Sequence, residues 1–196
     1  MLMSLHPQDV VVLLKLIAHR DRKRWTYADL GKDLLMSGSQ VFRSVDRAEG
    51  ARLLSAPTIP SDPKLREESP LTWMLPNSSN LKEFLIHGAK YSFPVQRGGP
   101  TRGIPTAEAA PPLNQILSQD FPLPPVWPHP AGLFRGIAFS PLHKTVPQAA
   151  MRDPKLYELL ALLDAIREGR AREREIAIHE LTARIDSADQ TKTSAT

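Results

Sequence analysis

The chain has 196 residues, 41% of them apolar, and carries 25 Lys and Arg against 21 Asp and Glu, a net charge of +4. It has no cysteine, which excludes disulfides, zinc–cysteine sites and thiol catalysis and fits a cytoplasmic protein. We expect no membrane partner, because we find neither a signal-peptide pattern nor an apolar run of roughly 18 residues. The isoelectric point near 9.5 mildly favours an anionic partner.

The N-terminal residues predict three helices. Apolar spacing indicates a first helix from Pro7 to His19, since proline suits the first turn. Thr26 is a typical N-cap for a second helix, and Ser37 is one for a third. The inward face of the third helix would carry Val41, Val45 and Ala48.

A hairpin and a fourth helix are expected next. Residues 52–56 and 70–75 read as short strands, and the polar loop at 55–72 would be a wing. Asn80 with Glu83 would cap the fourth helix, which Gly88 would end.

The segment from Tyr27 to Ala48 resembles the helix-turn-helix of bacterial winged-helix regulators of the MarR-like and related groups. The matching positions are Asp29, Leu30, Leu34, Ser37, Ser39, Gln40, Val41, Arg43, Val45 and Arg47. Gly31 and Leu35 stand where the pattern has alanine and glycine. The resemblance covers roughly residues 7–90 and implies a winged helix-turn-helix domain over 1–90 that binds double-stranded DNA, with a homodimer as the expected assembly.

The side chains of the third helix suggest how DNA would be read. Ser39, Gln40 and Arg43 would contact base edges in the major groove. Arg47 and the cluster at 22–24 would hold phosphates, as would the helix N-terminus near Ser37. The expected DNA-binding set is Ser37, Ser39, Gln40, Arg43, Ser44, Arg47, Arg22, Lys23, Arg24, Lys64 and Arg66. Phe42 would either pack beside Val45 or touch a thymine methyl.

The rest of the chain predicts an α+β extension. Residues 91–150 would be a Pro/Gly-rich irregular and β segment, with a strap anchored by Phe121 and Trp127 and a strand within 133–142. Residues 151–185 would form two helices, the first capped by Asp153 and ended by Gly169. Its leucine side would be core or a dimer seam. Residues 186–196 would be a disordered tail.

The loop "RGGPTRG", residues 97–103, is distinctive but not a phosphate-binding P-loop, because it lacks the glycine spacing and the Gly-Lys-Ser/Thr ending. One interpretation is a tight hairpin with exposed arginines. The other is an anion nest, which would serve as a minor-groove DNA contact or a ligand loop.

These patterns favour a sequence-specific transcriptional regulator, most simply a repressor, with no enzyme activity, metal or cofactor. The alternative is a protein-interaction module, such as an antitoxin-like autoregulator whose extension wraps a protein partner. A third hypothesis is a small-molecule sensor. Its cavity would lie near Trp73, Phe84, Tyr91 and Phe93.

Overall fold

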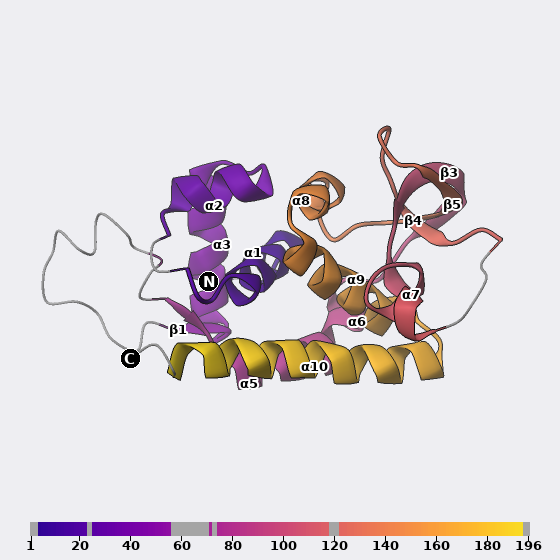
Figure 1. Cartoon of the computed structure of the whole chain (residues 1–196). Coiled ribbons are helices and arrows are strands. Elements are labelled where there is room, and N and C mark those ends of the chain that lie inside the picture. Colours follow the sequence, from indigo (N-terminus) through magenta and orange to yellow (C-terminus); the bar gives the residue numbers. More distant parts are fainter. Residues whose placement is uncertain (1–3, 23–24, 56–70, 72–73, 118–121, 194–196) are drawn as a thin grey trace, which may run out of the picture. The chain divides into compact units, whose positions relative to one another are not determined.

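The computed structural model describes the whole chain except residues 1–3, 23–24, 56–70, 72–73, 118–121 and 194–196 and the side chains of 191–193 (Figure 1). The chain divides into two compact units, residues 1–81 with 185–196 and residues 82–184. Helices and small sheets occur together, so the α+β class is confirmed. The division at residue 81 comes earlier than the expected boundary at 90. The expected central and C-terminal segments belong largely to one unit.

The first unit begins with three helices and a two-stranded ladder. They are α1 (Pro7–Ala18), α2 (Tyr27–Leu34), α3 (Gly38–Gly50), β1 (Leu54–Ser55) and β2 (Leu75–Pro76). The strands are antiparallel, with Leu54 opposite Pro76. The three helices and the first strand are therefore confirmed. The expected strand at 70–75 overlaps β2 only at Leu75, and residues 70 and 72–73 lie outside the described residues. Most of the loop expected to be a wing lies outside the described residues.

The core of this unit follows the predicted helical spacing. Val41, Val45 and Ala48 of α3 are buried, and α3 contacts both α1 and α2. Thr26 caps α2 by accepting the N–H of Asp29 at 3.0 Å, as predicted. These local signals position α3 against the other two helices.

The turn between α2 and α3 explains both departures from the helix-turn-helix pattern. Leu35 adopts a left-handed conformation (φ 57°), and the N–H of Met36 bonds to the carbonyl of Gly31 at 2.8 Å. This is the bonding of a Schellman motif, which usually has glycine at the left-handed position. A Cβ on Gly31 would lie only 2.6 Å from the carbonyl oxygen of Met36. Gly31 is therefore required by the turn that Leu35 forms.

We predict that Gly31→Ala lowers the free energy of unfolding by about 2 kcal/mol, because the added Cβ forces the turn apart. Gly50→Ala is the matched control, since Gly50 has no atom within 4 Å of an added Cβ. This control should be neutral or stabilising by about 0.5–1 kcal/mol, as alanine is in a helix. Urea unfolding of both variants measures the difference. Equal effects would contradict the proposed packing.

The fourth helix differs from its prediction. The helical run comprises α5 (Ser78–Glu83), the π-helical turn η2 (Phe84–Gly88) and α6 (Ala89–Ser92). Asn77 rather than Asn80 caps it, because the Asn77 side chain accepts the N–H of Asn80 at 3.2 Å. Gly88 does not end the run. The helix continues through the π turn to Ser92.

The second unit contains a small closed barrel of β3 (Arg97–Pro105), β4 (Pro125–Pro128) and β5 (Phe134–Phe139). β3 is antiparallel to both neighbours, and β4 is parallel to β5. The expected strand within 133–142 is therefore confirmed as β5. "RGGPTRG" is neither a tight hairpin nor a loop, because it forms most of β3 and pairs with β5.

The remaining helical elements are η3 (Ala107–Ala109), α7 (Leu113–Ile116), α8 (Val146–Arg152), α9 (Pro154–Glu168) and α10 (Ala171–Thr193). All belong to the second unit except the end of α10, which from Ile185 onward belongs to the first. Asp153 caps α9 at the N–H of Leu156 (3.1 Å), and Gly169 follows its last residue, as predicted. The prediction of a disordered tail is wrong for residues 186–193, because α10 continues to Thr193 as one helix (Figure 1).

A buried polar cluster fixes the Pro-rich segment to α9. Asp164 is 1% exposed, and one of its carboxylate oxygens accepts bonds from Trp127 (2.7 Å) and Thr106 (2.8 Å). The other oxygen accepts a bond from Arg167 at 2.7 Å. Burial raises the pKa of Asp164, and these donors oppose the rise. Trp127 thus anchors the strap as predicted, whereas Phe121 lies outside the described residues.

Alkaline stability should depend on Tyr157 of α9. Its hydroxyl donates to the carbonyl of Pro105 at 2.6 Å, and burial raises the pKa of Tyr157 from 10.0 to about 12. The folded state holds this proton more tightly, so the resulting stability is complete below pH 10 and is lost as the pH rises to about 12.

We predict that above pH 10 the wild type loses roughly 1 kcal/mol per pH unit relative to Tyr157→Phe, after allowance for the partial exposure of the ring. Urea unfolding at a series of pH values measures this difference, and the remaining tyrosines cancel in the comparison. A difference that stays constant from pH 8 to pH 11 would show that the phenol is not buried.

Candidate nucleic-acid interface

The outward face of α3 presents a short row of side chains. Ser39, Phe42 and Arg43 are exposed, opposite the buried Val41 and Val45. Residues at i, i+3 and i+4 share one face of a helix, so the three form a continuous surface over the first two turns. We call this surface the α3 face.

A hollow lies at the N-terminal end of the α3 face. It is a shallow, open depression of about 480 Å³ that is lined by Tyr27, Gly38, Ser39, Phe42 and Arg43. The rings of Tyr27 and Phe42 meet edge to face, with centroids 5.4 Å apart. Phe42 is nevertheless 53% exposed. It therefore contacts α2 on one side and remains open to a partner on the other, so it does not simply pack beside Val45.

Ser37 and Gln40 are bonded to each other in a capping box. The N–H of Ser37 donates to Gln40 Oε1 at 2.9 Å, and Ser37 Oγ accepts the N–H of Gln40 at 3.2 Å. Gln40 therefore helps to begin the helix. To pair with adenine through both ends of its amide, Gln40 would have to break this bond. Its conformation therefore favours capping of the helix over contact with a base.

Two further residues that were expected to contact DNA, Ser44 and Arg47, bond to residues of α1. Ser44 is fully buried and accepts a bond from Gln8 at 3.2 Å, so its DNA-binding assignment is wrong. Arg47 makes a two-pronged ion pair with the fully buried Asp9, at 2.8 Å through Nε and 2.6 Å through Nη2. This bond raises the pKa of Arg47. Arg47 thus joins α3 to α1 rather than standing free for a phosphate.

We predict that Arg47→Met lowers the free energy of unfolding by about 3 kcal/mol, because it leaves a buried carboxylate without its counter-charge. Arg43→Met is the matched control, since no hydrogen bond or ion pair of Arg43 is found among the described residues. The control should change stability by less than about 0.5 kcal/mol. If Arg47→Met unfolds like the control, Arg47 is free to bind a ligand.

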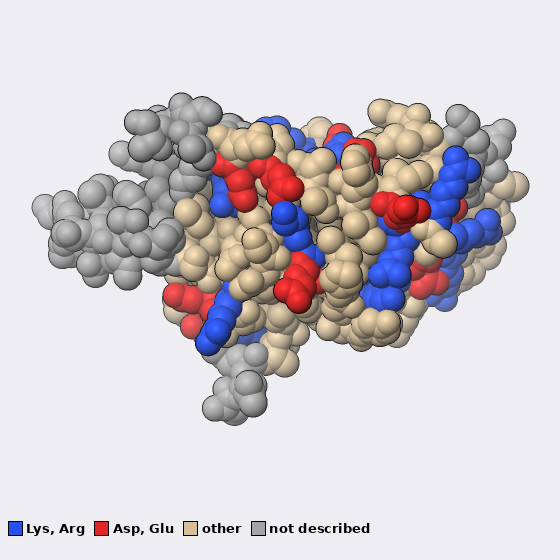
Figure 2. All heavy atoms as spheres, turned by 90° about the horizontal axis from the view of Figure 1, so that it is seen from below, with Lys and Arg blue, Asp and Glu red and all other residues tan. Residues whose placement is uncertain are grey.

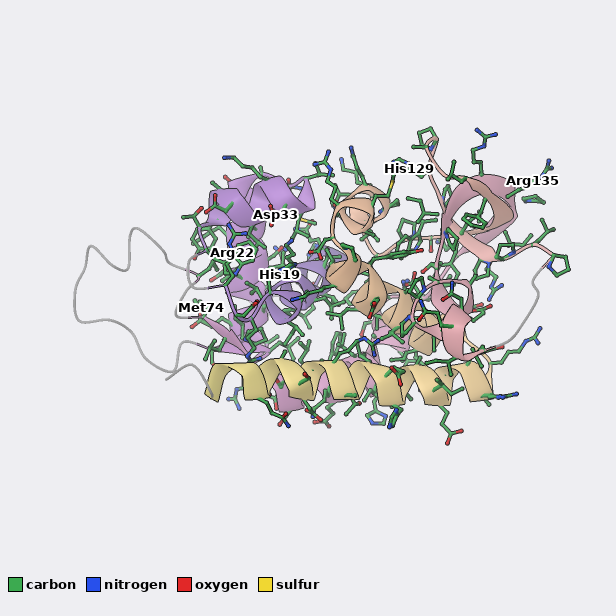
Figure 3. All side chains as sticks on the ribbon, viewed as in Figure 1. His19, Arg22, Asp33, Met74, His129 and Arg135 are labelled. Atoms are coloured by element: carbon green, nitrogen blue, oxygen red, sulfur yellow. The ribbon has the colours of Figure 1, made fainter. Side chains whose placement is uncertain are left out.

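The expected phosphate cluster is only partly described. The Arg22 guanidinium stacks on Trp25, 3.8 Å from the ring centroid, and lies 3.5 Å from Asp33 (Figure 3). Its side chain is 42% exposed, so it can also contact a phosphate. Lys23, Arg24, Lys64 and Arg66 lie outside the described residues.

Acidic residues share the C-terminal part of α3. Asp46 and Glu49 are exposed there, and both add to the rise in the pKa of Tyr27, whose main cause is burial. The first unit as a whole has 12 Lys and Arg against 11 Asp and Glu, a net charge of +1. Figure 2 shows charges of both signs interspersed on the face over which α10 runs. The positive charge available for DNA therefore comes from single exposed residues such as Arg43 and Arg22, not from a broad basic surface.

Sequence reasoning missed Tyr27, Asp46 and Glu49. The helical spacing from Ser39 to Asp46 could have placed Asp46 on the outward face. The contact of Tyr27 with Phe42 depends on the crossing of α2 and α3, for which the sequence has no signal. Of the residues expected around a sensor cavity, Phe84 and Phe93 meet edge to face with ring centroids 6.1 Å apart, whereas Tyr91 is 76% exposed. Trp73 lies outside the described residues.

No group of three or more His, Asp or Glu side chains that could hold a metal ion occurs within the described ranges. No helix in that part of the chain is long and apolar enough to span a membrane. Comparisons of the chain with protein-family models, with curated proteins and with solved structures found no match.

Proposed function

We propose that the protein is a sequence-specific DNA-binding transcriptional regulator, and that the N-terminal half of α3 enters the major groove. The observation that carries this proposal is the α3 face. Ser39 and Arg43 are exposed on the first two turns of a helix that the Arg47–Asp9 pair and the Schellman turn hold in place. Together with the β1–β2 ladder, these helices support a winged helix-turn-helix.

Each exposed side chain has a matching DNA group. Arg43 can donate two bonds to a guanine, and Ser39 can bond to a base or a phosphate. Phe42 offers an apolar surface to a thymine methyl. Asp46 and Glu49 lie further along α3, away from the end that enters first. Arg22 is partly exposed and can contact a phosphate independently of the DNA sequence.

Binding to duplexes tiled across the upstream region of the gene tests the proposal, with fluorescence anisotropy at several salt concentrations. We expect one duplex to bind most tightly, and Arg43→Ala to weaken it by about 1–3 kcal/mol. Arg172→Ala is the matched control. It removes the same charge from an exposed position on α10 and should change binding little. The salt slope should be small, because few phosphates can be contacted.

Equal and weak binding to every duplex would contradict the proposal, as would equal losses in Arg43→Ala and Arg172→Ala. The first result would mean that DNA is attracted only nonspecifically to a basic protein. The second would mean that Arg43 acts through its charge alone and that α3 does not read the sequence.

The second candidate is a protein-interaction module. Phe42 favours it, because an exposed aromatic next to an arginine is typical of interface hot spots. Asp46 and Glu49 favour it too, because they repel phosphates but not a basic protein surface. A stoichiometric protein that co-purifies with the wild type and is lost with Phe42→Ala would support this candidate. Bound nucleic acid would support the first.

A further inference from the structure

The barrel of the second unit displays two arginines side by side. Arg102 of β3 stands directly opposite Arg135 of β5 in the antiparallel ladder. Both are exposed, and neither guanidinium has a hydrogen bond or ion pair among the described residues. Figure 3 shows Arg135 at the outside of the barrel. Like charges at directly opposite positions of a sheet repel each other, so a bound anionic group would relieve the pair.

Large apolar side chains adjoin these arginines. Leu133 is 92% exposed and Phe134 is 54% exposed, although both are residue types that proteins usually bury. They line a hollow of about 320 Å³ together with Pro100, Thr101, Arg102 and Arg135. We call these six residues the barrel surface. It combines arginine and aromatic side chains, the composition that is enriched in protein interfaces.

The backbone beneath the barrel surface is tightly packed. A Cβ on Gly132 would overlap the backbone of Gly103, and one on Gly136 would overlap the carbonyl of Pro124. The N–H of His129 also donates to the carbonyl of Arg102 at 3.2 Å. The exposed side chains therefore stand on a platform that has little freedom to move. Binding to such a platform loses less entropy than binding to a mobile loop.

We propose that the barrel surface binds a segment of a partner protein that carries carboxylates next to an apolar side chain. Arg102 and Arg135 fit carboxylates, because a guanidinium can donate two parallel hydrogen bonds to each of them. Leu133 and Phe134, which line the same hollow, fit the neighbouring apolar side chain. Single-stranded nucleic acid fits less well, because an aliphatic side chain such as Leu133 gains little from a sugar–phosphate backbone. This site does not depend on DNA binding by the first unit.

Selection of random twelve-residue peptides displayed on phage, with the full chain as the target, tests the proposal. The Arg102→Gln/Arg135→Gln double variant serves for counter-selection. We expect the enriched peptides to carry at least two Asp or Glu next to an apolar residue. In anisotropy, a labelled peptide of this kind should bind at least about tenfold more weakly to the double variant and to Leu133→Ser. Arg172→Gln, at an exposed position on α10, should bind it like the wild type.

Three outcomes would overturn the proposal. One is the absence of enriched peptides, or the enrichment of peptides without acidic residues. Another is a peptide affinity that the double variant and Leu133→Ser leave unchanged. The last is a labelled oligothymidine that binds the wild type more tightly than the peptide and loses this affinity in the double variant. Circular dichroism of each variant checks that it folds, which we expect because the replaced side chains are exposed.

Discussion

The ion pair between Arg47 and the buried Asp9 decides which side of α3 meets solvent. Asp9 also accepts the N–H of His6 at 2.8 Å, so one carboxylate both begins α1 and holds α3. Removal of a charge from water is costly unless its partners replace the lost hydration. The arrangement of α1 and α3 is therefore tied to that single carboxylate. Rotation of α3 about its axis would break both bonds from Arg47.

The second unit uses the same chemistry for another purpose. Asp164 and Arg167 neutralise each other on α9, and their remaining hydrogen bonds reach Trp127, Thr106 and the carbonyl of Phe93. A Pro-rich chain has few backbone donors with which to form regular structure. The bond from Trp127 to this buried carboxylate adds to the backbone pairing of β4 with β3 and β5. The direct pairing of β3 with β5 brings Arg102 opposite Arg135.

Elements whose signals are local could be predicted from the sequence. Caps at Thr26, Ser37 and Asp153, together with apolar spacing, placed α1, α2, α3 and α9 closely. β3 could not be predicted, because its glycines and prolines lack strand propensity and its partner residues in β5 lie 31 to 42 positions further along. The end of α10 was missed for a similar reason. Its polar residues suggest a tail, but Asp189 bonds to Arg20 and Ser78, which are far away in the sequence.

The candidate site was predictable only as a helix face. Periodicity placed Ser39 and Arg43 outside, and the bond of Gln40 to Ser37 follows a local capping-box pattern. The partners of Ser44 and Arg47 lie on α1 and depend on the tertiary fold. The formal charge of +4 is thus a poor guide to binding. Arginines already paired with buried carboxylates, such as Arg47 and Arg167, contribute to the fold and offer little to a ligand. Arg43 on α3 and the Arg102–Arg135 pair on the barrel have no such partner among the described residues. These three arginines also line hollows together with exposed apolar side chains, which is not found for Arg172 in the part of the chain that the structure describes, so partner recognition should depend on them.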